Sequence, residues 1–154
     1  MKKLCLLSIL CLCFVACGHE SADIGTEEAA ARILTEYERN AFVRADDDFI
    51  KTNFGTPDHL KEATVYYAAN GDGTEFGFFR VADASSVDDM EWLIKDYLAT
   101  ERAAVESLAE LYPADELVSR LARLDSAAVG HVGNTVYYCV ADSALYQAFL
   151  KKLG

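Results

Sequence analysis

Residues 75–112 read EFGFFRVADASSVDDMEWLIKDYLATERAAVESLAELY, and this stretch contains the two elements that decide the fold. Its first part, Glu75 to Val81, is rich in aromatic and β-branched residues and predicts a strand. Ser86 then stands where a helix cap is expected, and two aspartates follow in the first turn, where they favour the positive end of the helix dipole. The apolar residues that come next recur at helical spacing, which predicts one long helix to about Tyr112.

The apolar side of this predicted helix is formed by Met90, Leu93, Ile94, Tyr97, Ala104, Val105, Leu108 and Leu111. We expect this side to pack on a sheet, with Leu108 as a buried anchor. Trp92 falls at the edge of the apolar stripe and is expected to be a partly exposed ring. Glu91 and Lys95 are four residues apart and form a favourable pair on the opposite side.

Outward from this stretch, the sequence predicts two hairpins and three further helices. The strands are expected at residues 64–69, 75–81, 127–132 and 135–140. Asn-Gly-Asp-Gly at residues 70–73 and Gly-Asn at residues 133–134 are strong turn signals between them. The further helices are expected at residues 26–42, 113–122 and 144–153, with residues 44–61 mostly loop. The predicted fold is therefore α+β, with an antiparallel sheet of about four strands packed against the long helix and with N- and C-terminal helices.

Two short segments echo each other. FFRVAD at residues 78–83 parallels YYCVAD at residues 137–142, and each stands between a predicted strand and a predicted helix. The echo is either a duplicated hairpin-and-helix unit or a chance match, because aspartate favours helix starts wherever they occur.

The first seventeen residues have the layout of an export signal. Lys2 and Lys3 precede an apolar run that reaches Ala16 with only Ser8 as a polar interruption. Such a run is too short to cross a bilayer as a helix, but it is typical of a secretory signal peptide. Its end, Phe-Val-Ala-Cys-Gly at residues 14–18, resembles a lipobox, the processing signal of bacterial lipoproteins; an ordinary secretory signal is the alternative.

This resemblance implies a domain organisation and a location. Residues 1–16 would be removed as a signal peptide, and Cys17 would carry the lipid. Residues 17–25 would form a flexible tether, and residues 26–154 a single domain. Acyl chains on Cys17 would hold the protein to the outer side of the cell membrane, with membrane lipid as its first partner.

Composition sets further limits on partners and cofactors. Removal of residues 1–16 takes away two lysines and no acid, so the net charge of −11 becomes −13. This negative charge argues against binding to nucleic acid or to an anionic lipid surface. Four of the five cysteines lie in the first seventeen residues, so Cys139 cannot form a disulfide within the domain. We expect Cys139 to be a small buried hydrophobe, with a reactive thiol as the alternative.

The order of several motifs supports a family resemblance. The segments TEFGFFRV (74–81), LYPADE (111–116) and VGNTVYY (132–138) follow the lipobox in this order. The chain thereby resembles the bacterial family called domain of unknown function 4358, which consists of small lipoproteins. The resemblance covers roughly residues 45–152. It implies a fold and a location but no chemistry, since the family has no assigned activity.

Residue types that carry catalysis or bind metals occur here without the required spacing. His19, His59 and His131 have no histidine or cysteine partner at metal-ligand spacing. The segment NGDGTE (70–75) looks like a calcium loop, but the positions that need acidic ligands are occupied by Ala68 and Phe79. The acidic run at residues 46–48 is expected to be a solvated loop, with a weak divalent-cation site as the alternative. We therefore expect no catalytic group, no metal and no cofactor.

Neighbouring aromatic pairs within the strands favour a binding role. Each of the pairs 66–67, 78–79 and 137–138 should send one ring to each face of the sheet, because side chains alternate along a strand. The candidate surface aromatics are Tyr66, Phe79 and Tyr137. Either the helix expected at residues 26–42 covers this row, which we favour, or the row is exposed and marks a docking surface.

The expected function is binding of a protein or cell-wall partner by a membrane-anchored, non-catalytic domain. A structural envelope component and a hydrolase are the alternatives. A sheet face left open by the first helix would favour binding. A deep polar cleft that holds an acid of raised pKa would favour the hydrolase.

Overall fold

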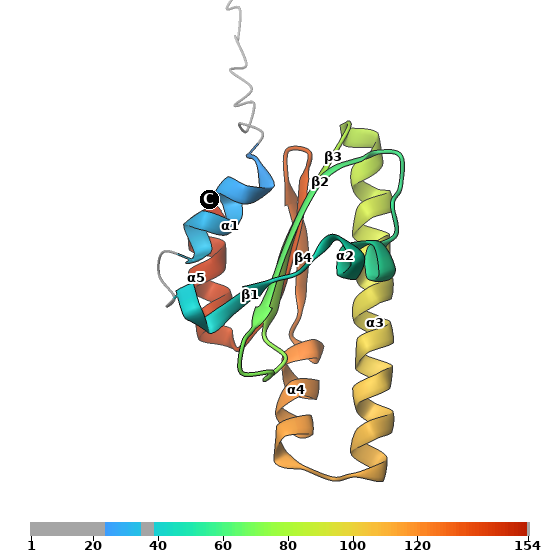
Figure 1. The fold of residues 1–154 in the computed structure, drawn as a ribbon, viewed down its shortest axis with the longest axis vertical. Helices are drawn as coiled ribbons and strands as arrows, with labels where there is room; N and C mark the ends of the chain where they lie inside the picture. Colours follow the sequence, from blue (N-terminus) through green and yellow to red (C-terminus); the bar gives the residue numbers. More distant parts are fainter. Residues whose placement is uncertain (1–23, 35–38, 154) are drawn as a thin grey trace, which may run out of the picture.

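The structure, a computed structural model, describes residues 24–34 and 39–153 and has an α+β fold (Figure 1). The helices are α1 (Thr26–Leu34), α2 (Asp47–Phe54), α3 (Val87–Leu111), α4 (Asp115–Asp125) and α5 (Ser143–Leu153), with short 3-10 helices η1 (Arg39–Ala41) and η2 (Ala84–Ser86). The strands are β1 (Phe42–Arg44), β2 (Leu60–Ala68), β3 (Glu75–Val81), β4 (Ala128–Val132) and β5 (Thr135–Val140).

The strands form one antiparallel sheet in the order β1-β2-β3-β5-β4. Both predicted hairpins are present as β2–β3 and β4–β5, and the central pair β3–β5 joins them, with Phe78 opposite Tyr137. The α+β prediction and the two-hairpin core of the sheet are therefore confirmed.

The prediction of one helix over residues 26–42 is wrong at its C-terminal end. Residues 35–38 lie outside the described part of the chain, and Phe42–Arg44 form the edge strand β1. Phe42 pairs with Ala68 and Arg44 with Tyr66, so β1 meets the otherwise open edge of β2. Hydrogen bonding to this edge outweighs the local helical spacing, and the sheet has a fifth strand that the sequence pattern did not show.

Residues 44–61, predicted to be mostly loop, contain the helix α2. Asp46 is its N-cap, because the Asp46 side chain accepts a hydrogen bond of 2.8 Å from the Phe49 backbone N–H. Ile50 and Phe54, four residues apart, are the buried positions of this helix, and Gly55 ends it with a φ of 71°. The run of acids at residues 46–48 is thus a helix start, where negative charge favours the dipole.

Helices cover both faces of the sheet (Figure 1). On one face α2 and α3 enclose a core that includes Phe54, Phe79, Ile94 and Tyr138. On the other face α1 and α5 enclose a core that includes Ile33, Phe76, Phe78 and Phe149. The prediction that each aromatic pair sends one ring to each face is confirmed, since Phe78 and Phe79 lie in different cores. Coverage of the second face is also confirmed, but α1 shares it with α5.

The long helix α3 extends beyond the sheet, where only α4 returns alongside it (Figure 1). Ile94 and Tyr97 are buried as predicted, whereas Leu108 is 45% exposed and is not the buried anchor we expected. The reason is that Leu108 lies past the end of the sheet, so it has no second layer to pack against. Trp92 is 63% exposed, in agreement with its predicted position at the edge of the stripe.

The echo between residues 78–83 and 137–142 reflects shared helix-start chemistry. Asp83 accepts a hydrogen bond of 3.0 Å from Ser85 N, and Asp142 accepts one of 2.9 Å from Leu145 N. Ser86, predicted as the cap of α3, makes no capping hydrogen bond with its side chain. In a duplicated unit, a two-fold axis would relate β3 to its antiparallel neighbour β5. Such an axis runs perpendicular to the sheet, so the helices that follow the two strands, α3 and α5, would lie on the same face. Because α3 and α5 lie on opposite faces, the structure does not favour a duplication (Figure 1).

The described chain begins at one end of the sheet. The backbone oxygen of Ile24 accepts a hydrogen bond of 2.9 Å from Thr135, at the start of β5. The backbone oxygen of Gly25, a residue expected within the tether, accepts a hydrogen bond of 2.9 Å from Ala29 N in α1. Within residues 24–34 and 39–153, no helix combines the length and the apolar character that a membrane span requires.

Candidate functional site

Two hollows lie on either side of the β2–β3 turn, at the end of the sheet opposite Ile24. At this end Ala68 pairs with Phe42, and Glu75 pairs with Val140. We call the hollow between β1, the turn and the start of α5 the β1–α5 cavity, and the hollow between the turn, α2, α3 and α4 the Glu75 pocket.

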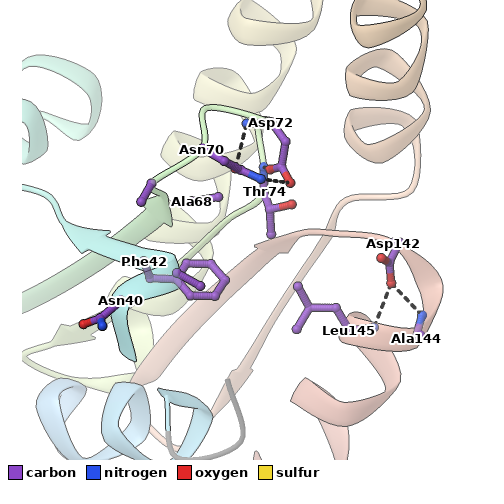
Figure 2. A pocket seen from close by; sticks show the side chains of 11 residues that line it. Asn40, Phe42, Ala68, Asn70, Asp72, Thr74, Asp142, Ala144 and Leu145 are labelled. Atoms are coloured by element: carbon purple, nitrogen blue, oxygen red, sulfur yellow. Dashed lines mark hydrogen bonds between the residues drawn. The ribbon is translucent and has the colours of Figure 1, made fainter. Parts of the chain in front are cut away.

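The β2–β3 turn that separates the hollows is held by its own side chains (Figure 2). The Asn70 side chain accepts a hydrogen bond of 3.1 Å from Asp72 N, and the Asp72 side chain accepts one of 2.7 Å from Thr74 N. Burial alone would raise the pKa of Asp72, but hydrogen bonds from Thr74 and Asn70 and the charge of Arg123 outweigh it and lower that pKa. The loop that resembles a calcium site is thus a turn whose side chains form hydrogen bonds with its own backbone, and the sequence spacing also indicated a turn.

The β1–α5 cavity has a volume of about 510 Å³ (Figure 2). Phe42 and Leu145 face each other across it, and small alanine side chains widen it. Its rim is polar and includes the carboxylates of Asp72 and Asp142, and none of the lining residues whose side chains the structure describes is a lysine, arginine or histidine. An apolar floor with an acidic rim suits an uncharged or cationic ligand that has hydrogen-bond donors, and it disfavours an anion.

The Glu75 pocket is smaller, about 230 Å³, and more polar. Glu75 points to the α3 side of the sheet, where the hydroxyl of Tyr97 donates to its Oε1 at 3.0 Å and its Oε2 at 3.1 Å. The hydroxyl of Tyr138 donates to Oε1 as well. Beside this group, Arg120 of α4 forms an ion pair of 2.8 Å with Glu101 of α3.

The surroundings of Glu75 disfavour its ionised form. Burial raises the pKa of Glu75 above its usual range, and the negative charge of Glu101 adds to this effect. Hydrogen bonds from Tyr138 and Tyr97 and the charge of Arg120 act in the opposite direction but do not cancel it. Burial, followed by the nearby Glu75 charge, also raises the pKa of the Tyr97 and Tyr138 hydroxyls, so both remain proton donors.

This shift predicts a pH dependence of stability. Because the pKa of Glu75 is higher in the folded than in the unfolded chain, its contribution to stability is complete at low pH and is lost as the pH rises through the folded pKa. Glutamine cannot ionise, so Glu75→Gln should gain stability relative to the unmodified protein as the pH rises from about 4 to 8. Denaturant midpoints of both proteins across this range would measure the difference.

Glu91→Gln is the matched control, because it removes a carboxylate whose shift has the opposite sign. Hydrogen bonds from Lys95 and His131 lower the pKa of Glu91. The Glu91→Gln variant should therefore lose stability relative to the unmodified protein over the same pH rise. Parallel pH profiles for the two variants would contradict the assignment of Glu75.

The three candidate surface aromatics do not form one row. Phe79 is fully buried beneath α2 and α3, so its prediction as a surface residue is wrong. Tyr66 and Tyr137 lie on the other face, where both are half-buried. Tyr66 stacks on Phe76 with ring centroids 5.6 Å apart, and Tyr137 contacts Phe149 at 5.4 Å.

The other residues singled out in the sequence lie apart from both hollows. His131 Nδ1 is 3.0 Å from Glu91 Oε1 at the surface, and His59 is half-buried in the approach to β2. Cys139 is buried and free, as expected, and burial together with the Asp142 charge raises its pKa to about 12. Cys17 and His19 lie outside the described residues.

Sequence reasoning missed the residues of the Glu75 pocket, although one signal was present. With side chains alternating along β3, Glu75 has the same parity as Gly77 and Phe79, which face the core beneath α3. A carboxylate at a core-facing strand position is costly unless it is paired, and it therefore indicates a polar site. The partners could not be predicted in the same way, because Tyr97 comes from α3 and Tyr138 from β5.

No protein-family description, no curated protein and no solved structure significantly matches this chain. The resemblance to the domain of unknown function 4358 therefore stays a prediction based on the motifs in the sequence.

Proposed function

We propose that this chain is a lipoprotein, anchored through Cys17 to the extracytoplasmic face of the cell membrane, and that its domain binds a ligand without catalysis. The observation that carries the binding role is the β1–α5 cavity of about 510 Å³, with its apolar floor and acidic rim. A volume in this range suits a small molecule or the end of a cell-wall or protein chain. The described lining residues include no basic side chain, which favours an uncharged or cationic group.

The position of the cavity supports this proposal. The chain from the proposed anchor enters the fold at Ile24, which binds Thr135 at the first residue of β5. The cavity lies at the other end of that strand, next to Asp142. Six residues of strand span about 20 Å. A tether attached at Ile24 would leave the cavity open on the side away from the membrane.

One experiment in living cells tests the anchor and the cavity together. Cells that express the full chain are grown with a fatty-acid probe, and proteins near the chain are then cross-linked and identified. Cys17→Ser should abolish the lipid label, because only that thiol is proposed to be acylated. Ala69→Trp should remove the cavity-dependent cross-links, because Ala69 is exposed on the cavity wall and a large ring there would fill the space.

Ala103→Trp is the control for the second arm, since Ala103 is an exposed alanine on α3 that does not line the cavity. It should leave both the label and the cross-links unchanged. Lipid label that persists on Cys17→Ser would overturn the anchor. Identical cross-links in the two tryptophan variants would overturn the cavity as the binding site.

A hydrolase is the second candidate, and Glu75 is the observation that favours it. A carboxyl with a raised pKa beside a polar pocket is a feature of general acids in glycoside hydrolases. Release of soluble fragments from purified cell walls by the full chain, abolished in Glu75→Gln, would support this candidate over a purely binding role.

A further inference from the structure

We propose that the Glu75 pocket binds the ammonium group of a small organic cation. This inference goes beyond the β1–α5 cavity, because it concerns a different hollow on the opposite face of the sheet and gives it a ligand class.

Three aromatic side chains are part of the wall of the Glu75 pocket. Phe49 of α2, Tyr67 of β2 and Tyr97 of α3 all line it. The ring centroid of Phe49 is 6.1 Å from that of Tyr67 and 6.4 Å from that of Tyr97, so Phe49 contacts both tyrosine rings. Aromatic faces attract cations through their quadrupoles, and this attraction is strongest for groups that shed water easily, such as alkylated ammonium.

The ion pair of the pocket does not include Glu75. Arg120 is paired with Glu101 and acts on Glu75 only through its charge, whereas the hydrogen bonds to the Glu75 carboxyl come from the neutral hydroxyls of Tyr97 and Tyr138. A carboxylate can accept about four hydrogen bonds, and these two hydroxyls leave acceptor capacity on Oε2. A bound monovalent cation would balance the charge and would favour the ionised form that burial of Glu75 opposes.

The size and the ligand atoms favour an organic cation over a metal ion. A hollow of about 230 Å³ has room for an ammonium head and its methyl groups. Calcium and magnesium require six or more oxygen ligands, whereas this pocket offers two carboxylates, one of them already paired. Among the described residues, no group of three or more His, Cys, Asp or Glu side chains is placed to hold a metal ion.

Calorimetric titration of the full chain, purified in a non-ionic detergent, tests the proposal with two probes. Methylammonium chloride and choline chloride are titrated at constant ionic strength, alongside 3,3-dimethyl-1-butanol, the uncharged isostere of choline. We expect at least one cation to bind and the isostere to bind roughly tenfold or more weakly, because it lacks the charge. Equal binding of choline and its isostere, or no binding of either cation, would overturn the proposal.

Two variants connect this binding to the pocket. Tyr67→Leu keeps an apolar side chain of similar bulk but removes the ring, and should weaken cation binding by about 2- to 30-fold. Tyr67 is 38% exposed, so the variant is expected to fold. Glu75→Gln should weaken binding as well. Tyr112→Leu, the control, removes a tyrosine that is 68% exposed at the far end of α3, and should change nothing.

An affinity that is unchanged in both Tyr67→Leu and Glu75→Gln would place the cation elsewhere and would overturn the proposal. This failure is distinguishable from a failure of the proposed function, because the cross-links that depend on Ala69 report on the other hollow.

Discussion

Phe79→Ala is expected to destabilise the folded domain by about 3–5 kcal/mol, the usual cost of removing a fully buried aromatic ring. Phe79 has no exposed surface. Its ring centroid lies 4.6 Å from that of Phe54 in α2 and 6.1 Å from that of Tyr138 in β5. The substitution would therefore open a void between the sheet and the helix layer, which rigid neighbours cannot fill. Denaturant unfolding followed by far-ultraviolet circular dichroism would measure the loss.

Trp92→Ala is the matched control, because it removes a larger ring that is 63% exposed on α3. Its effect should lie within about 0.5 kcal/mol, as for most surface substitutions. Equal unfolding midpoints for the two variants would contradict the burial of Phe79. They would instead support the prediction from the sequence that Phe79 is a surface residue.

The placement of Phe79 illustrates what the strand pattern can and cannot predict. Alternation shows that Phe78 and Phe79 face opposite sides, and this holds in the structure. The pattern does not show which residues of neighbouring strands share a side, because this depends on register. Phe78 lies opposite Tyr137, and Tyr66 lies opposite Phe76, so Phe79 is on the other face from the two candidate tyrosines. Register is set by contacts between strands that are distant in sequence.

The elements that the sequence predicted well are those with strong local signals. The Asn-Gly-Asp-Gly and Gly-Asn turns placed both hairpins, and the helical spacing from Met90 to Val105 placed α3. The elements it missed are short. The strand β1 has three residues and forms only because β2 offers an edge, and α2 buries only Ile50 and Phe54. The helical spacing of apolar residues also continues to Leu108. The sheet that covers α3 ends before this residue, which is therefore exposed.

The candidate site was less predictable than the fold, because its residues converge from separate elements. The Glu75 pocket unites two strands, the turn between them and three helices. The β1–α5 cavity depends on β1 and on the start of α5, the first of which no pattern indicated. The core-facing parity of Glu75 is a local sign of the Glu75 pocket in the sequence.

Gly77→Ala is expected to cost about 1–3 kcal/mol, although alanine is normally the better residue in a strand. Gly77 is a central residue of β3 on the face toward α3. A Cβ added there would stand 2.5 Å from Cε1 of Tyr138 and 2.9 Å from Cγ2 of Val65. Both neighbours are fully buried, so the added methyl group cannot be accommodated by a small movement. Displacement of the Tyr138 ring would also move its hydroxyl away from Glu75.

Gly130→Ala in β4 provides the control for this effect, since it makes the same chemical change in a neighbouring part of the sheet. Its added Cβ would meet Tyr137 at the hydroxyl oxygen, 2.7 Å away, but this is the free end of a half-buried side chain. That end can swing outward, so Gly130→Ala should cost clearly less than Gly77→Ala.

A double-mutant cycle separates the steric cause from a general effect on the strand. In a Tyr138→Val background the ring that blocks residue 77 is gone, and the further change Gly77→Ala should then cost little or even stabilise the domain. Unfolding midpoints of the four proteins give the coupling between the two positions. Additive effects would mean that the Tyr138 ring does not depend on the space that the absence of a side chain at Gly77 leaves. A large positive coupling would show that Gly77 provides the space that lets Tyr138 lie against β3 and reach the carboxylate of Glu75.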